Sequence, residues 1–239
     1  MHHKHFETID STQLYLKNNY SDLAKKNREK NILISSSQQS KGIGRHGNSW
    51  DHYKNSLAFS FSLEITQNKN LSILPLNLSV YLIEWLETKT ETPLSVKWPN
   101  DIIIKPFKKC GGILCNYLNP ETMIVGIGLN YGNISFQKEH SYKTKPGVIS
   151  KGRELNEKEK KDLPISFYEY LLKKDYNSQT KLREWERLCA HLNHRVRLTI
   201  GPNNSCEGLF KGLSHSGEAI IEDERKVEKS FCSGSLNII

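Results

Sequence analysis

The sequence lacks the features that would place it in a membrane or direct it to secretion. No apolar run approaches the roughly 20 residues that a bilayer-spanning helix needs. The first residues are basic and rich in histidine, and they lack the apolar core of a signal peptide. We therefore expect a cytoplasmic protein with no membrane partner.

Cysteine is scarce, and its spacing is irregular. The five cysteines are an odd number, and no two of them form a C-x-x-C pair, which predicts free thiols in a reducing compartment. Cys189, His191 and His194 are close in sequence and are candidate metal ligands. A structural zinc site needs a fourth ligand, and lone cysteines and histidines are common at packed positions. We therefore predict no metal site.

A concentrated basic region is also missing, although the net charge is positive. The 239 residues hold 34 Lys and Arg against 26 Asp and Glu, which gives +8, but the densest tract, 158–161, is interrupted by Glu159. About ten residues precede the first expected helix, too few for a helix-turn-helix module. We therefore predict no DNA partner. The composition, with 36% apolar and 25% charged residues, is typical of a soluble globular protein.

The hydrophobic spacing predicts an α+β fold, in which helices cover a mixed β-sheet. Apolar residues three and four apart predict helices, and alternating or short apolar runs predict strands. Helices are expected over 11–26, 74–85, 167–175 and 181–190, with strands over 31–36, 57–65, 94–98, 102–104, 111–117 and 123–129. The polar segment 133–162 is predicted to be a loop.

The composition changes near residue 190. Short strands are expected over 196–200, 207–213, 218–222, 227–231 and 236–239, separated by turn residues such as Ser216-Gly217 and Ser233-Gly234. This pattern predicts a small SH3-like β-barrel at the C-terminus. We therefore expect a larger domain over 1–190 and a small domain over 191–239.

A glycine-rich stretch, Gly42-Ile43-Gly44-Arg45-His46-Gly47, is the first motif that indicates chemistry. Glycines allow a backbone to approach a ligand closely, and the Arg45 guanidinium suits a phosphate or a carboxylate. A Rossmann loop would lead into a helix, but a strand is expected next, so we reject a dinucleotide site. The spacing is not that of a P-loop either.

Three further motifs follow in order: Lys97-Trp98-Pro99-Asn100-Asp101, Lys109-Cys110-Gly111-Gly112-Ile113-Leu114 and Gly126-Ile127-Gly128-Leu129-Asn130. Together with the glycine loop and the opening 7–13, they resemble the biotin protein ligases, and the resemblance extends over most of the chain. It implies a class II synthetase-like catalytic domain. The implied reaction has two steps: biotin and ATP, with Mg²⁺, give biotinyl-5′-AMP, and biotin then passes to a lysine of a biotin carboxyl carrier domain of a carboxylase.

The resemblance also implies roles for individual residues. Lys109 bridges the biotin carboxylate and the α-phosphate, Arg45 lies near the phosphates, and Asp101 orients or deprotonates the incoming lysine. The implied biotin contacts are Ser11, Thr12, Gln13, Gln39, Gly42, Ile43, Gly44, Arg45, Lys109, Gly111 and Gly112. The implied ATP contacts are Arg45, Trp50, Asn100 and Asn130, with the Trp50 indole as a lid on adenine.

Some residues have a simpler interpretation, and two depart from the family pattern. Ser11 is also a candidate helix cap, Lys97 is interpreted as a surface lysine outside the chemistry, and Trp98 as a core residue. Where the family has an arginine between the two loop glycines, this chain has Ile43, and Gln13 replaces the usual asparagine. One cationic contact to the intermediate is therefore expected to be absent.

Two other functions stay open. The lipoate and octanoate ligases are similar in fold, although the Ser-Thr opening and the 97–101 motif favour biotin. A biotin-sensing protein without catalysis is the non-enzymatic alternative. An exposed edge strand of the sheet is expected to pair in a homodimer or to dock the carrier, by analogy with the fold.

Overall fold

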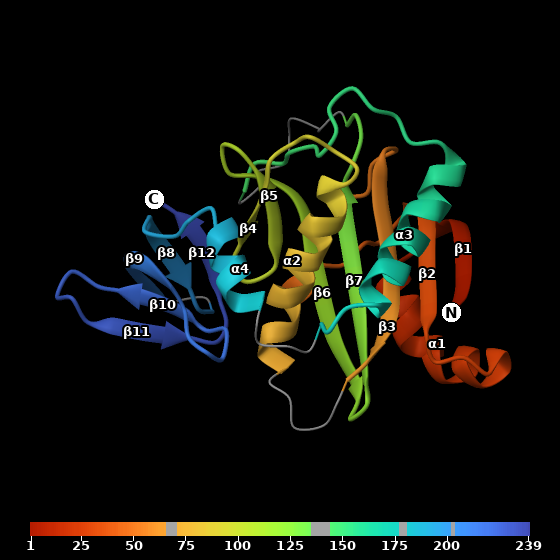
Figure 1. Ribbon diagram of the computed structural model, residues 1–239, viewed down its shortest axis with the longest axis horizontal. Helices are drawn as coiled ribbons and strands as arrows, with labels where there is room; N and C mark the ends of the chain where they lie inside the picture. Colours follow the sequence, from red (N-terminus) through yellow and green to blue (C-terminus); the bar gives the residue numbers. More distant parts are fainter. Residues whose placement is uncertain (66–70, 135–143, 177–180, 202–203) are drawn as a thin grey trace. The chain divides into compact units, whose positions relative to one another are not determined.

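The computed structural model describes residues 1–65, 71–134, 144–176, 181–201 and 204–239. The chain forms two compact units (Figure 1). Unit 1 consists of Met1–Lys69 and Lys109–Lys174, and unit 2 of Asn70–Lys108 and Asp175–Ile239. Each unit therefore combines two separate stretches of sequence. The expected domain boundary at residue 190 stays a prediction.

The sheet of unit 1 is mixed, as predicted. Its strands lie in the order β1-β2-β3-β7-β6, and β1 and β2 are parallel while the other neighbours are antiparallel. The strands are β1 (His2–Ile9), β2 (Ile32–Gln39), β3 (Ser56–Glu64), β6 (Lys108–Asn119) and β7 (Thr122–Asn130). Sequence spacing predicted four of these strands and missed β1, whose histidines, lysine and glutamate hide its alternation.

The two faces of this sheet carry side chains of different size. In β3, Phe59 and Phe61 point to one face, where they pack on Phe167 of α3 (Glu157–Leu172). Successive strand residues alternate between faces, so Ala58 and Ser60 point to the other face. There α1 (Thr12–Asn27) packs Leu16 and Tyr20 on Ile32 and Ile34 of β2. Figure 1 shows α3 lying across β2 and β3.

Helix α3 corrects the prediction of a loop over 133–162. The helix begins at Glu157, ten residues before the expected start, because Asn156 and Glu159 form a capping box. The first turns are polar because much of their surface is exposed, which weakened the apolar periodicity. Residues 135–143 of the predicted loop lie outside the described residues.

Unit 2 contains helices and antiparallel strands. The β4–β5 hairpin carries the 97–101 motif, and α2 and α4 pack on β4. Its elements before residue 109 are η2 (Leu71–Ile73), α2 (Leu74–Glu87), β4 (Leu94–Lys97) and β5 (Asp101–Ile104). The later ones are α4 (Lys181–Leu188), β8 (Arg195–Thr199), β9 (Ser205–Leu213), β10 (Ala219–Glu222), β11 (Glu228–Phe231) and β12 (Ser235–Ile238).

The five C-terminal strands were predicted at nearly their observed positions, but they do not close into a barrel. Their order is β11-β10-β9-β8-β12, with every neighbouring pair antiparallel. Within the described part of the chain, β11 and β12 are the two ends of this order. The module is therefore an SH3-like open sheet.

The structure of the described residues shows the state of the cysteines and the surroundings of the candidate metal ligands. All five cysteines are free thiols. Cys189 Sγ lies 3.4 Å from His191 Nδ1, but within the described ranges no three His, Cys, Asp or Glu side chains are arranged to hold a metal ion. None of the described helices is both long and apolar enough to cross a bilayer.

Buried histidines make stability depend on pH. Burial lowers the pKa of His3 and of His52 to about 4, and that of His191 to about 3. The unfolded chain takes up these protons near pH 6.5, whereas the folded chain stays neutral to lower pH. The free energy of unfolding is therefore highest above about pH 6.5 and falls as the pH is lowered towards 4, by roughly 3 kcal/mol each for His52 and His191.

Urea unfolding between about pH 7.5 and 4.5 measures this loss. His52→Gln is the control, because it should remove its own share of the pH dependence. A free energy of unfolding that does not change over this window in the unmodified protein would contradict the expectation.

Candidate active site

A row of small residues crosses the α1 face of the unit 1 sheet. Ser36 of β2 pairs with Ala58 of β3, Ala58 pairs with Gly128 of β7, and Gly128 pairs with Gly112 of β6. Residues directly opposite each other in a ladder share a face. These four residues, here called the floor, therefore carry no side chain larger than that of serine, so other groups can approach the backbone of the sheet closely along this row.

The first turn of α1 borders the floor with hydroxyl groups. Ser11 caps the helix, since its Oγ accepts a hydrogen bond from the Leu14 amide at 3.4 Å. Thr12 donates its amide and its hydroxyl to Gln39 Oε1, at 2.8 and 3.0 Å, and its Oγ1 lies 2.9 Å from Ser60 Oγ. Ser11, Thr12 and Gln39, all predicted biotin contacts, are thus near one another, and Ser11 is a helix cap as well.

Gln13, the departure from the family's asparagine, reaches across the sheet. Its Nε2 donates to Asn116 Oδ1 at 2.9 Å and to the Ile124 carbonyl at 3.1 Å. The Oε1 lies over Gly126, where a Cβ would come within 2.5 Å of it. The side chain is 3% exposed. Gln13 thus fills the space that Gly126 leaves and holds its carbonyl oxygen at the edge of the floor.

The glycine loop is an ordered hairpin. The Trp50 amide donates to the Gly42 carbonyl at 2.9 Å, the Gly44 amide donates to the Asn48 carbonyl at 2.7 Å, and Ile43 pairs with Ser49. Gly42 has to be glycine, because a Cβ would lie 2.4 Å from the Trp50 carbonyl oxygen. Arg45 begins the short 3-10 turn η1 (Arg45–Gly47) at the tip. The predicted loop contacts are thus held together by backbone hydrogen bonds.

Trp50 places its indole on the floor. A Cβ on Gly128 would lie 2.5 Å from indole Cε2, and one on Gly112 would lie 3.7 Å from Cζ3. Lys109 Nζ lies 5.6 Å from the centroid of the ring, a cation–π contact. The structure thus brings Trp50, Lys109 and Gly112 together. The expected contact of Trp50 with adenine stays a prediction.

The segment 145–150, part of the predicted loop, holds Lys109 and Asn130 in place. The Lys109 amide donates to the Lys145 carbonyl, and its carbonyl accepts from the Gly147 amide, both at 2.8 Å. The Ile149 amide donates to the Asn130 carbonyl at 2.9 Å. Sequence analysis missed this segment because neither composition nor spacing indicates that it pairs with two strands.

Four buried polar atoms around the floor have no hydrogen-bond partner among the described residues. They are Gln13 Oε1, Ser36 Oγ, Trp50 Nε1 and Asn130 Oδ1. Asn130 pairs with Ser56, two residues along β3 from Ala58, so it points to the same face as the floor. A buried polar group without a partner costs roughly 1–3 kcal/mol. Four of them around one floor indicate a site for a polar ligand.

The predicted residues Asn100 and Asp101 belong to unit 2. Asp101 Oδ2 lies 3.1 Å from Lys97 Nζ, and Lys97 donates to the Leu236 carbonyl of β12 at 3.1 Å. The Lys97 side chain is only 9% exposed, so the interpretation as a surface lysine is wrong. Trp98 is a core residue, as predicted, and its Nε1 donates to the Gly217 carbonyl at 3.1 Å.

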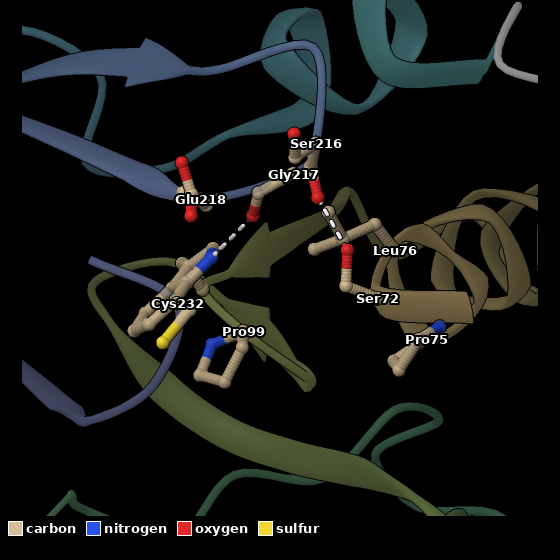
Figure 2. Close-up of a pocket in the computed structure, with 9 residues that line it drawn as sticks. Ser72, Pro75, Leu76, Pro99, Ser216, Gly217, Glu218 and Cys232 are labelled. Atoms are coloured by element: carbon tan, nitrogen blue, oxygen red, sulfur yellow. Dashed lines mark hydrogen bonds between the residues drawn. The ribbon is translucent and has the colours of Figure 1, made fainter. Parts of the chain in front are cut away.

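Unit 2 also contains a small cavity of about 40 Å³ (Figure 2). Ser72 of η2 donates to the Ser216 carbonyl across it (Figure 2). The lining residues are Ser72, Pro75, Leu76, Trp98, Pro99, Ser216, Gly217, Glu218 and Cys232. None of them is a predicted substrate contact, and the volume is far below the roughly 300 Å³ of a typical ligand pocket.

Comparison with known proteins decides the family. A family model described as the biotin/lipoate A/B protein ligase family matches residues 5–130, more than half of the chain. The chain belongs to this family. The match includes the glycine loop, the 97–101 motif and both strands, β6 and β7, that supply glycines to the floor.

Relatives within the biotin/lipoate ligase family resemble different shares of the chain. A biotin protein ligase from Aquifex aeolicus, solved in complex with biotin and ATP, has a TM-score of 0.77 and 28% identity, and the match covers 100% of this chain and 99% of that one. The biotin–protein ligase of Schizosaccharomyces pombe is 32% identical over 53% of this chain, which spans 23% of that protein. The bifunctional ligase/repressor BirA of Escherichia coli is 23% identical over 96% of this chain and 72% of its own length.

Within this family framework, sequence analysis missed three contributors to the floor: Ser36, Ala58 and Gly128. Gly128 was quoted in a motif but received no role. The alternation of small and large residues in β3 was the available signal for Ala58, because one face carries only Ala and Ser from Ser56 to Ser62. Ser36 gave no such signal, since it lies in a run of three serines whose orientation depends on the strand register.

Proposed function

We propose that this protein is a biotin protein ligase, which activates biotin with MgATP to biotinyl-5′-AMP and transfers it to a lysine of a biotin carboxyl carrier domain. The chain spans about a quarter of the S. pombe relative, so the proposal concerns the ligase reaction of this chain. The full-length likeness to a ligase solved with biotin and ATP supports it.

The observation that carries the proposal is the set of unpartnered polar atoms around the floor. The ureido ring of biotin has two N–H donors and one carbonyl acceptor. Gln13 Oε1 accepts only, and a serine hydroxyl donates or accepts. The dithiolane ring of lipoate and the hydrocarbon chain of octanoate offer no such groups and would leave these atoms unpaired. A site built for hydrogen bonds discriminates strongly against analogues that lack them.

Lys109 is proposed to act in the first step. A carboxylate oxygen of biotin attacks the α-phosphorus of ATP, and the bond from the α-phosphate to pyrophosphate breaks. Two anions must approach each other, so a preorganised cation at that point lowers the barrier. Lys109 provides this charge at the glycine end of the floor, and Arg45 at the tip of the loop adds a second cation.

The second step joins biotin to the carrier. The lysine amine attacks the acyl carbon of the adenylate, AMP leaves, and the amine gives up a proton. We assign Asp101 to orient or deprotonate this amine, with Asn100 beside it as a nucleotide contact. The buried Lys97 holds the carboxylate of Asp101 at 3.1 Å. Five free cysteines suit a reducing compartment, so we place the reaction in the cytoplasm.

Magnesium enters this reaction with its substrate. Mg²⁺ typically keeps several waters and binds through substrate phosphates with one or two carboxylates. A metal carried in this way needs no cluster of three or more side-chain ligands in the protein. Magnesium would there neutralise phosphate charge alongside Lys109 and Arg45.

Pyrophosphate release separates the candidate substrates. The protein is incubated with MgATP and one of three acids: biotin, lipoate or octanoate. Of the three, we expect only biotin to give pyrophosphate release above background. Addition of a carrier domain, followed by a streptavidin blot, tests the transfer. Release with lipoate or octanoate but not with biotin would overturn the proposal in favour of the other branch of the family. Biotin binding without pyrophosphate release would favour a sensor.

A further inference from the structure

Ser36 lies at one end of the floor and is among the most deeply buried polar residues of unit 1. It is 1% exposed, and its Oγ has no partner among the described residues. Strand pairing fixes the side to which it points, because Ser36 is opposite Ala58, which is opposite Gly128. The indole of Trp50 lies on Gly128. Two strand spacings, about 10 Å, separate Ser36 from the residue under that indole.

The hydroxyl groups of Thr12 and Ser60, which also lie on this face of the sheet, are paired with each other. Thr12 donates to Gln39 Oε1, and its hydroxyl contacts Ser60 Oγ. The next serine along β2, Ser35, points to the opposite face, where its Oγ lies 2.8 Å from His3 Nε2 and 2.8 Å from His5 Nδ1. Unlike the hydroxyls of Thr12, Ser60 and Ser35, the hydroxyl of Ser36 has no hydrogen-bond partner among the described residues.

We infer that the Ser36 hydroxyl is a specificity-determining group that hydrogen-bonds the polar ring of the acid substrate. This inference rests on the proposed function. Its basis is the position of the hydroxyl on the floor, its burial and its unpaired state. A buried hydroxyl without a hydrogen-bond partner destabilises the ligand-free protein. A ligand with a ureido group supplies a partner and removes this destabilisation on binding. A ligand without donors and acceptors does not.

Ser36→Ala tests the inference with little risk to folding, because it removes one oxygen atom that the fold does not use. Calorimetric titration of the full chain with biotin should show affinity about tenfold or more weaker than in the unmodified protein. Affinity for octanoate should not change. The Tm of the ligand-free variant should stay the same or rise, because an unpaired buried group is removed.

Ser35→Ala is the matched control, one residue away on the same strand. Because it breaks two hydrogen bonds to histidines on the opposite face, it should lower the Tm and leave the affinity for biotin within about twofold. We therefore expect Ser36→Ala to weaken biotin binding without lowering the Tm, and Ser35→Ala to lower the Tm without weakening biotin binding. A purely structural role for Ser36 would make the two variants behave alike.

The outcomes are distinct. Weaker biotin binding with an unchanged or higher Tm supports the role of Ser36. Unchanged biotin binding in Ser36→Ala overturns this inference and leaves the proposed function standing. A lower Tm in Ser36→Ala, with affinity for biotin and for octanoate reduced by the same factor, also overturns the inference and leaves the proposed function standing. Failure of the unmodified protein to bind biotin overturns the proposed function and the inference together.

Discussion

Lys109→Ala is expected to reduce adenylate formation by about 100- to 1,000-fold while the protein stays folded. Loss of one preorganised charge contact to a transition state typically costs about 2.7–4 kcal/mol. The side chain contacts the Trp50 ring and lies near Gly112, and the strand is held through the Lys109 backbone, which a substitution to alanine preserves. The measurement is the rate of pyrophosphate release with saturating biotin and MgATP.

Lys108→Ala is the matched control for charge. Lys108 is the preceding residue of β6, and it is exposed. It should retain near-normal activity, because a solvated charge contributes little to a site that it does not face. Equal losses in the two variants would show that the general basic character of this strand matters and that Lys109 has no special role. A folded Lys109→Ala variant with normal rates would contradict the assignment.

Gly128→Ala is expected to weaken biotin binding by roughly 10- to 100-fold. The new Cβ would lie 2.5 Å from Cε2 and 2.8 Å from Nε1 of the Trp50 indole, so the ring has to leave the floor or the sheet has to shift. Overpacking of this kind typically costs about 1–3 kcal/mol. Calorimetric titration with biotin gives the affinity. The chain has four tryptophans, so the fluorescence of Trp50 is taken as the difference from a matched Trp50→Phe variant, and it reports whether the indole has moved.

Gly112→Ala provides an internal comparison, because Gly112 is the residue directly opposite Gly128. There the Cβ would meet Lys109 Cε and Nζ at 3.5 Å and Trp50 Cζ3 at 3.7 Å, which are ordinary contact distances. The indole should therefore keep its position in this variant, and its fluorescence should stay unchanged. If both alanines are tolerated equally, the indole does not rest on Gly128, and the description of the floor is wrong.

The fold could be predicted where local pattern is strong. The strict alternation over 57–65 and the amphipathic spacing over 74–85 gave β3 and α2, and the turn residues after 195 gave the five C-terminal strands. Local pattern failed where other forces dominate. The strand β1 is polar at its edge of the sheet, and α3 begins with a capping box in a charged stretch. Barrel closure depends on a pairing between distant strands, which no local signal specifies.

The residues of the candidate site also fall into those that the sequence indicated and those that only the structure revealed. Sequence alone determined the motifs, and thereby the family and the roles expected of Lys109, Thr12 and Gln39, because those motifs depend on residue type and spacing. Only the tertiary structure decided that Ser36 and Gly128 share a floor and that Lys97 is buried against Leu236. The reason is register: a shift of one residue turns every side chain of a strand to the other face. Register is set by pairing between strands far apart in the chain, so the residues that line the floor are fixed only when the sheet assembles.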